Sequence, residues 1–291
     1  MNLLRKLLFV SVAFVLFSCE EKEDKSTDFT QEWLFTKGIE GPAVDSKGNL
    51  YAVNYMREGT VGIVDSKAKV SLFVDLPEGS IANGIRFDAD DNMYLADYTK
   101  HQVLFIKSGS KAVEVFAQDS TMNQPNDLAI TADGILYASD PDWENSTGNI
   151  WRILKDSCVI LESGMGTTNG IEVSPANDKL YVNESVQRKI WVYDITANGD
   201  LKNKKLFASF PDFGLDGMRC DVKGNLYVCR YGKGTVVVLS PNGQKIREIQ
   251  LTGKKPTNIT FGGKDHKQCF ITLADRGCFE VFIANEVGKR F

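Results

Sequence analysis

The pattern that decides the fold is clearest in NGIRFDADDNMY, residues 83–94. A polar residue and a glycine come first, a short apolar strand and a polar turn follow, and an aromatic residue lies in the next strand. The pattern occurs six times, beginning at Glu40, Asn83, Asn126, Asn169, Asp216 and Asn258. An aromatic residue follows each start by 11 or 12 positions, and successive starts are 43, 43, 43, 47 and 42 residues apart. The chain is therefore built from one repeated unit.

Each repeat has room for four short strands, which is the size of one blade of a β-propeller. The six copies predict an all-β, six-bladed β-propeller that occupies residues 32–291 as one domain. The sixth copy ends after residues 279–283 without an outer strand, whereas the segment Glu32 to Phe35 precedes the first inner strand. We therefore expect this N-terminal segment to be the outer strand of the sixth blade and to close the ring, which leaves no open sheet edge.

The first 18 residues resemble a bacterial lipoprotein signal peptide. Arg5 and Lys6 precede an apolar run from Leu7 to Phe17, and Cys19 follows where a lipobox places its cysteine. An ordinary secretory leader, in which Cys19 has no role, is the alternative. Residues 19–31 are polar and acidic and are interpreted as a flexible, lipid-anchored tether. The mature protein is then expected outside the cytoplasm, held to a bacterial membrane by the anchor alone, on its periplasmic or cell-surface side.

Charge and residue counts disfavour several classes of site. The net charge is −4 and no basic stripe is present, which argues against nucleic-acid binding. The chain has two histidines, His101 and His266, too few for a histidine-rich zinc site, and the repeat places His266 at the end of the propeller away from the mouth. Five cysteines follow Cys19 without a CxxC motif, so we expect buried thiols. The sequence leaves the oligomeric state open.

The six starting residues are all carboxylates or carboxamides, and the repeat aims them at the central channel at similar height. Converging carboxylate and amide oxygens suit a hard divalent cation, with Ca²⁺ first and Zn²⁺, Mn²⁺ or Mg²⁺ as alternatives. The alternative is turn chemistry, because Asn-Gly and Asp-Gly are common turn formers. That explanation accounts poorly for six oxygen-bearing residues in one phase of the repeat.

The same segments resemble the senescence marker protein, gluconolactonase and luciferin-regenerating enzyme family. The resemblance rests on Glu40-Gly41-Pro42-Ala43-Val44, on the segment from Asn169 to Pro175, on Asp216-Gly217-Met218 and on the segment from Thr257 to Gly263. It runs from about Glu40 to about Ile271. It implies a six-bladed propeller with one divalent cation in the channel, and hydrolysis of sugar lactones by many members.

The resemblance also implies site residues. Glu40, Asn169 and Asp216 match the family's metal ligands, and Asn126 matches a residue that contacts substrate or metal. Gln124 stands where sugar-lactonase members often carry an arginine, so an aldonolactone is less well supported than the metal site. In this interpretation Glu40 holds the cation and Asp216 is the catalytic base, with a purely structural ligand or a direct nucleophile as the other roles for Asp216.

The loops at the mouth are expected to set specificity, although each of their residues could equally be an ordinary exposed loop residue. The candidate substrate-binding residues are Asn83, Asn126, Asn258, Asp97, His101, Asp140, Trp143 and Arg230. The activity predicted from these residues is cation-dependent hydrolysis of a small lactone or related ester. The alternative from another class is a non-enzymatic, metal-stabilised propeller that binds a glycan or a protein.

Overall fold

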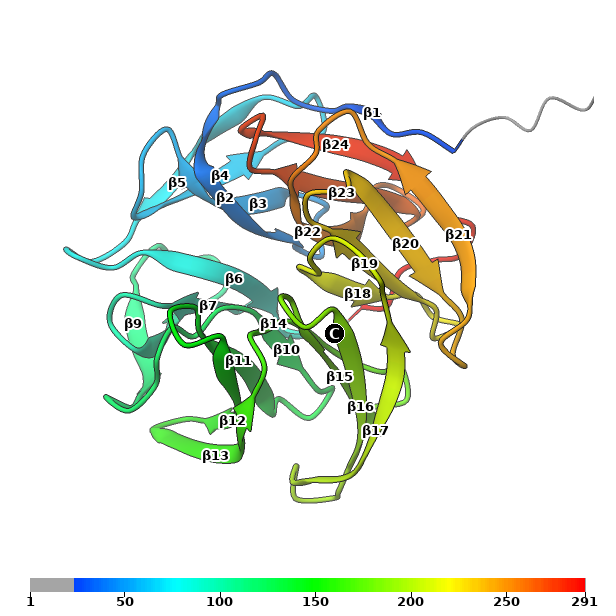
Figure 1. Cartoon of the computed structure of the whole chain (residues 1–291). Helices are drawn as coiled ribbons and strands as arrows, with labels where there is room; N and C mark the ends of the chain where they lie inside the picture. Colours follow the sequence, from blue (N-terminus) through cyan, green and yellow to red (C-terminus); the bar gives the residue numbers. More distant parts are fainter. Residues whose placement is uncertain (1–23, 291) are drawn as a thin grey trace, which may run out of the picture.

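The computed structural model, which describes residues 24–290, is a ring of six four-stranded antiparallel sheets (Figure 1). From the innermost strand outward, the sheets are β2–β5, β6–β9, β10–β13, β14–β17, β18–β21 and β22–β24 followed by β1. The predicted all-β, six-bladed propeller is therefore confirmed. The signal peptide and Cys19 lie outside the described residues. Between residues 24 and 290 there is no helix long and apolar enough to cross a membrane.

The strands of the first three blades are β2 (Phe35–Val44), β3 (Leu50–Tyr55), β4 (Thr60–Val64), β5 (Val70–Asp75), β6 (Ala82–Phe87), β7 (Met93–Asp97), β8 (Gln102–Ile106), β9 (Glu114–Gln118), β10 (Leu128–Ile130), β11 (Leu136–Asp142), β12 (Thr147–Leu154) and β13 (Ser157–Met165). The other three blades contain β14 (Thr168–Val173), β15 (Lys179–Glu184), β16 (Lys189–Ile195), β17 (Leu201–Ser209), β18 (Met218–Cys220), β19 (Leu226–Arg230), β20 (Thr235–Leu239), β21 (Lys245–Gln250), β22 (Pro256–Gly262), β23 (Gln268–Leu273), β24 (Cys278–Ile283) and β1 (Thr27–Asp28).

The ring is closed by an N-terminal strand, but not by the one we predicted. Thr27 and Asp28 form β1, which pairs with β24 at Val281 and Glu280. The segment Glu32 to Phe35 instead approaches the innermost strand, and Phe35 is already the first residue of β2. The predicted closing strand therefore lies a few residues too late in the chain. Residues 29–34 are needed to pass from the outer edge of the sixth blade to the axis of the propeller.

The segment interpreted as a tether is in part a piece of the propeller. Ser26 donates its backbone N–H to the carbonyl of Gln250 at 3.0 Å, and Asp24 forms an ion pair with Arg247 at 2.7 Å. Arg276 strengthens the closure further, because its guanidinium binds Asp28 and the neighbouring acids Glu32 and Glu280. The docked chain therefore begins at residue 24 at the latest, earlier than the predicted boundary at residue 32.

The repeated aromatic residue ties the turn between the first two strands of a blade. In the first blade, the Asp45 carboxylate accepts the backbone N–H of Asn49 at 2.8 Å and the Tyr51 hydroxyl at 3.0 Å. In the second blade, Asp88 accepts the Tyr94 hydroxyl at 3.1 Å in the same way. In these two blades the polar turn and the aromatic residue are therefore one hydrogen-bonded unit, whereas the Tyr137 hydroxyl of the third blade donates to the carbonyl of Gly199.

The glycines after the starting residues allow the innermost strands to pack closely. The Gly84 N–H donates to the carbonyl of Asn126 at 2.8 Å, and a Cβ atom at Gly84 would lie 2.9 Å from that oxygen. A Cβ atom at Gly170 would collide with the carbonyl of Asp216. Gly84 and Gly170 lie within strands β6 and β14, so turn chemistry does not explain their presence.

An irregularity at the start of each of four inner strands brings a second set of side chains to the axis. The register shifts at Glu40 to Ala43 in β2, and at the equivalent points of β6, β14 and β22. A bulge re-aims the residues that follow it. Arg86, three positions after Asn83, consequently reaches across to the carbonyl of Ile171 at 3.2 Å. The residues at this second level, each paired with the repeated aromatic residue of its blade, are Ala43, Arg86, Ala129, Glu172, Arg219 and Thr260.

Candidate metal centre

The six starting residues lie on or just before the innermost strands, at one end of the axis, which we call the front end. Glu40, Asn169 and Asn258 belong to β2, β14 and β22, and Asn126 and Asp216 lie two residues before β10 and β18. Glu40, Asn169 and Asp216 are all buried. The ring thus collects oxygen-bearing side chains from every blade, as the repeat predicted.

Two amide oxygens at the front end have no hydrogen-bond partner. Asn126 Oδ1 and Asn169 Oδ1 are buried and unpartnered among the described residues. A buried carbonyl oxygen without a partner costs free energy, so such a group usually has a ligand that has not been counted. Two of these oxygens, both in the starting ring, indicate an electron-pair acceptor between them.

Burial and neighbouring negative charges disfavour the ionised form of two carboxylates at the same end. Burial, and then the negative charge of Asp127, raise the pKa of Glu40 to about 7. Burial, and then the charge of Glu40, raise the pKa of Asp216 well above its usual range. A divalent cation would reverse both effects by supplying the missing positive charge. Glu40, Asp216, Asn126 and Asn169 therefore fit a hard cation through two carboxylates and two amide oxygens.

The other two starting residues donate hydrogen bonds to their neighbours. Asn258 Nδ2 donates to Glu40 Oε2 at 3.0 Å, while Asn258 Oδ1 accepts the N–H of Ile259 at 2.9 Å. Asn83 Nδ2 donates to the backbone carbonyl of Asn126 at 3.2 Å. The Asn258 amide is therefore committed to positioning a candidate ligand, and the Asn83 amide to holding the backbone at another, whereas we expected both to bind substrate.

Sequence reasoning missed a layer of charge directly behind this ring. Asp127 is fully buried and forms ion pairs with Arg86 at 3.1 Å and with Arg219 at 3.6 Å. Burial, and then the charge of Arg86, lower the pKa of Arg219 to about 10. The available signal was that Asp127 replaces the glycine that follows the starting residue in four other copies.

Asn183 was also missed, because it lies in the second strand of its blade. Its Nδ2 donates to the carbonyl of Asp216 at 2.6 Å, and its Oδ1 is buried without a partner among residues 24–290. The signal that could have identified it was an asparagine directly after the apolar segment from Leu180 to Val182. Asn183 therefore fixes the backbone of a candidate ligand.

Asp140 is structural where we expected a mouth residue. Its carboxylate is fully buried and accepts the backbone N–H groups of Asn123 at 2.8 Å and Gln124 at 2.7 Å, together with Trp151 Nε1 at 2.8 Å. These bonds hold the loop that delivers Asn126 to the axis. The carboxylate is therefore occupied by the scaffold.

Asp97 and Arg230 have the same role in their own blades. Asp97 accepts the N–H of Ile81 at 3.2 Å and Gln102 Nε2 at 2.8 Å, and is fully buried. Arg230, also buried, donates to the Asp212 carboxylate at 2.9 Å. Each residue lies at the end of a second strand and holds the loop that leads into the innermost strand of its own blade.

The structure does not connect the remaining two mouth candidates to the ring. Trp143 is 44% exposed in the turn between β11 and β12. His101 is half-buried with a φ of 55°, and its Nδ1 atom has no partner. Within residues 24–290, no hydrogen bond or ring contact joins either side chain to the four candidate ligands. The described residues also contain no group of three or more His, Cys, Asp or Glu arranged for a metal, so the cation would depend on the asparagine oxygens.

The sequence matches a known family over most of its length. Residues 36–275 match the sequence model described as the SMP-30/Gluconolactonase/LRE-like region. The chain belongs to this family. The expected thiols also agree with the structure, since all five described cysteines are free and four of them are buried.

Two relatives in this family show how widely the sequence is shared. Diisopropyl-fluorophosphatase of Loligo vulgaris is 28% identical over 298 residues, which covers 89% of this chain and 95% of that protein. Gluconolactonase of Zymomonas mobilis is 27% identical over 267 residues, which covers 77% of this chain and 73% of that protein. Family members with lactonase names are therefore among the relatives of this chain.

Solved structures independently show the same fold. A calcium-binding protein, regucalcin, from Agrobacterium tumefaciens superposes with a TM-score of 0.78 at 18% identity, covering 92% of this chain and 96% of that one. A gluconolactonase from Xanthomonas campestris superposes with a TM-score of 0.75 at 21% identity, covering 89% of each chain. At these identities the comparison establishes the architecture of the family member described here.

Proposed function

We propose that this protein is a divalent-cation-dependent hydrolase of a small lactone or related ester. One observation carries the proposal: two buried carboxylates and two unpartnered buried amide oxygens meet at the front end of the axis. Gluconolactonase among its relatives supports a lactone as substrate, and a calcium-binding protein of the same fold supports Ca²⁺ ahead of Zn²⁺, Mn²⁺ or Mg²⁺. No nucleic-acid partner is proposed, and the oligomeric state stays open.

In this proposal the four oxygen-bearing side chains have different roles. Glu40, Asn126 and Asn169 hold the cation, and Asp216 both holds it and accepts the proton of the attacking water. When bound, the cation supplies a Lewis acid for the substrate carbonyl and makes water a better nucleophile. Asp216 can act as a base only when it is ionised, so its raised pKa has to fall when the site is loaded.

Gln124 bears on which lactones and esters the protein accepts. The Gln124 side chain has no positive charge, although the family often uses an arginine at this place, and its backbone N–H is bound by Asp140. A guanidinium binds several hydroxyls or a carboxylate at once, which an amide cannot do as well. We therefore propose that simple lactones and esters are turned over at least as well as aldonolactones.

Two conservative variants test the roles at the front end. Asp216→Asn and Glu40→Gln keep the shape and one oxygen donor but remove a charge. We expect both to bind Ca²⁺ more weakly in calorimetry, and excess Ca²⁺ to restore turnover in Glu40→Gln. Asp216→Asn should stay low at saturating Ca²⁺, because proton removal contributes roughly 10²–10⁴-fold to rate. Asp75→Asn, an exposed carboxylate on β5, is the control.

The assay uses a panel of aldonolactones, unsubstituted lactones, aryl esters and a fluorophosphate. Full rescue of both variants by Ca²⁺ would remove the base role from Asp216 and leave the metal site intact. Calcium binding without turnover of any substrate would favour a metal-stabilised propeller that binds a glycan or protein. Absence of binding at millimolar Ca²⁺ would refute the proposal altogether.

We also propose that Cys19 carries a lipid that holds the protein outside the cytoplasm. The motive is the basic and apolar leader that ends at Ser18-Cys19. Replacing Cys19 with Ala should move the protein from the membrane fraction to the soluble one. A variant that stays membrane-bound and is processed as before would show that the lipobox interpretation is wrong.

A further inference from the structure

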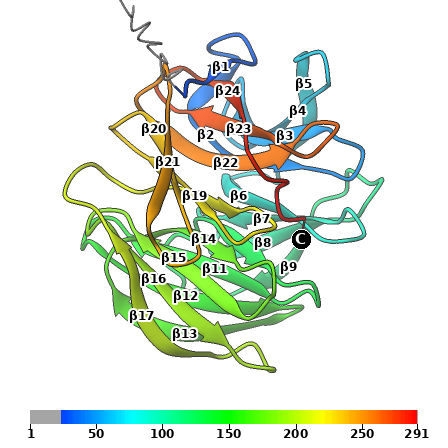
Figure 2. The same ribbon diagram turned by 90° about the vertical axis from the view of Figure 1, so that its right-hand side faces the viewer.

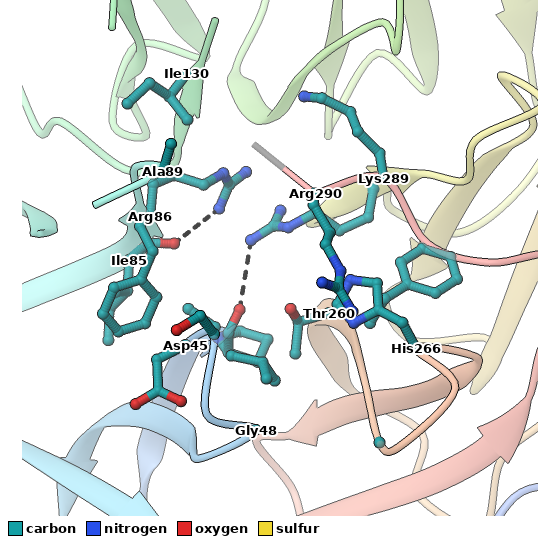
Figure 3. Close-up of a pocket in the computed structure, with 18 of the residues that line it drawn as sticks. Asp45, Gly48, Ile85, Arg86, Ala89, Ile130, Thr260, His266, Lys289 and Arg290 are labelled. Atoms are coloured by element: carbon teal, nitrogen blue, oxygen red, sulfur yellow. Dashed lines mark hydrogen bonds between the residues drawn. The ribbon is translucent and has the colours of Figure 1, made fainter. Parts of the chain in front are cut away.

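The end of the axis opposite the candidate metal centre, which we call the rear end, contains a cavity of about 240 Å³. It is bordered by the turns that follow β2, β6 and β22 and by the C-terminal segment (Figure 3). Figure 2 shows that segment running back from β24 toward the axis. None of the four candidate metal ligands lines this cavity. The proposed function therefore makes no use of it.

The lining of this cavity is rich in cations. Four of its side chains are Arg86, Arg219, Lys289 and Arg290, and its two acids are Asp45 and Glu172. The protein as a whole has a net charge of −4. A concave site with an excess of positive charge in an acidic protein concentrates small anions.

The cations are only partly neutralised by neighbouring acids. Glu172 lies 2.9 Å from Lys289 Nζ and 3.7 Å from Arg86, and the two arginines share the buried Asp127 behind them. Asp45 accepts hydrogen bonds from its own turn and from Tyr51. Within residues 24–290, no acid forms an ion pair with Arg290. The positive charge at the rim therefore exceeds the negative charge available to it.

The C-terminal segment is built into the rear end and supplies two of these cations. Val222 and Gly288 donate their N–H groups to Val287 and His266, each at 2.9 Å, and Lys289 donates to Cys220 at 3.0 Å. Gly288 packs so closely on Phe261 that a Cβ atom would collide with its ring. These backbone contacts hold Lys289 and Arg290 beside the axis, although their positive charges repel those of the other cations there.

Hydroxyl groups complete the lining. Ser46 and Thr260 both border the cavity, together with His266 and Arg290 (Figure 3), and the Ser46 hydroxyl donates to Asp91. Burial, and then the charge of Arg290, lower the pKa of His266, so its imidazole is neutral at pH 7 and can donate or accept one hydrogen bond. Guanidinium, ammonium and hydroxyl groups around one small volume are the donors that carboxylates and phosphates require.

We propose that this rear cavity binds a small oxyanion of the carboxylate or phosphate class. Arg290 and Lys289 provide the outer charge, the buried pair of Arg86 and Arg219 provides the floor, and the Thr260 hydroxyl provides a neutral donor. The cavity volume of about 240 Å³ suits a small ligand. The front end, with its buried carboxylates, would repel the same ligand.

Calorimetric titration of the full mature chain tests this site. Inorganic phosphate and D-gluconate are the two probes, each at constant ionic strength with chelator present, so that no cation is bound at the front end. We expect at least one probe to bind at millimolar concentration and to raise the thermal unfolding temperature. Phosphate binding alone would assign a phosphate ligand, and gluconate binding alone a carboxylate ligand.

A paired set of variants locates the binding. Lys289→Met with Arg290→Gln should weaken the bound probe by about tenfold or more, since charge-assisted hydrogen bonds are lost. Lys264→Gln, an exposed cation of the neighbouring turn that does not line the cavity, should leave affinity within about twofold. Arg290→Gln alone, which breaks no described ion pair, should retain the wild-type unfolding temperature and still lose affinity.

Three results would overturn the proposal. Neither probe binds the wild-type protein at 10 mM, the control variant loses as much affinity as the paired variant, or Arg290→Gln binds as the wild type does. None of these results depends on turnover or on calcium, so the rear site can fail while the proposed hydrolase stands, and the reverse also holds.

Discussion

The two ends of the axis differ in charge although the same six strands build both. At the front end, burial and neighbouring carboxylates raise the pKa of both Glu40 and Asp216, and two amide oxygens have no partner within residues 24–290. At the rear end, cationic side chains outnumber acids. The front is formed by the first residue of each repeat, whereas the rear combines Arg86, Glu172 and Arg219 of the inner strands with Lys289 and Arg290 of the C-terminal segment. The inner strands and the C-terminal segment together therefore give one ring two ends of opposite polarity.

The largest expected contrast between the ends is in calcium affinity. Asn169→Leu removes an unpartnered oxygen at the front end and should weaken calcium binding by more than the 10–100-fold typical of outer-shell changes. The matched rear variant Lys289→Met should leave calcium affinity within about twofold, because its ammonium is paired with Glu172 at the opposite end of the axis. Calorimetry on both variants checks this. A similar loss in both would mean that the two ends are not electrostatically separate.

Asp140→Ala should have the next largest effect, on stability. Its carboxylate satisfies the N–H groups of Asn123 and Gln124 and the Trp151 indole, which would be left without an acceptor. We expect the free energy of unfolding to fall by roughly 3 kcal/mol, as for a lost charged hydrogen bond and the donors left unsatisfied. Glu144→Ala, in the exposed turn of the same blade, is the control. A higher KM at unchanged stability would instead place Asp140 in the substrate site.

The third expectation is a stability that depends on pH and on calcium together. Without a cation, the pKa of Glu40 is about 7 in the folded chain against 4.5 ordinarily, so the folded state binds more protons between these values. The free energy of unfolding should therefore fall as the pH rises from about 4.5 through 7. Thermal unfolding with calcium or chelator measures this, and calcium should stabilise more at about pH 8 than at about pH 5. An equal calcium effect at both pH values would contradict it, and Glu40→Gln should flatten the dependence.

The smallest effect is expected at the rim of the mouth. Trp143 is 44% exposed, so Trp143→Ala should change the free energy of unfolding by no more than about 0.5 kcal/mol. Calcium affinity should not change. A shift of KM that depends on substrate size would show that this side chain contacts substrate, and an unchanged KM for the whole panel would remove it from the site.

The sequence was sufficient for the architecture and for the first ring of side chains. The blade count, the inner strands and the convergence of the starting residues follow from the spacing of the repeat, which is a property of the chain alone. The second level was not foreseen, because simple alternation in a strand does not place Asn83 and Arg86 on the same side. The register shift at the start of the inner strand does so, and nothing local in the sequence identifies it.

The mouth residues were misassigned for a related reason. Asp97, Asp140 and Arg230 are polar and lie at the front end, which is also true of ligand-binding residues. Their buried hydrogen bonds to the loops that lie 16 to 18 residues earlier in the same blade become visible only in three dimensions. The sequence predicted that an N-terminal strand closes the ring, but the predicted strand lies too late in the chain. Nothing in the sequence indicates how many residues are needed to cross a blade.

The N-terminal segment that is bound to the propeller limits the length of chain between the propeller and the proposed lipid anchor. Asp24 is fastened to Arg247 on the outer edge of the propeller, so only five Cα-to-Cα steps separate it from Cys19. Five steps span at most roughly 18 Å when fully extended. If Cys19 is acylated, the propeller stays within that distance of the lipid surface and is attached by its rim. Neither end of the axis is then blocked by the attachment, and both stay open to solutes that diffuse along the bilayer.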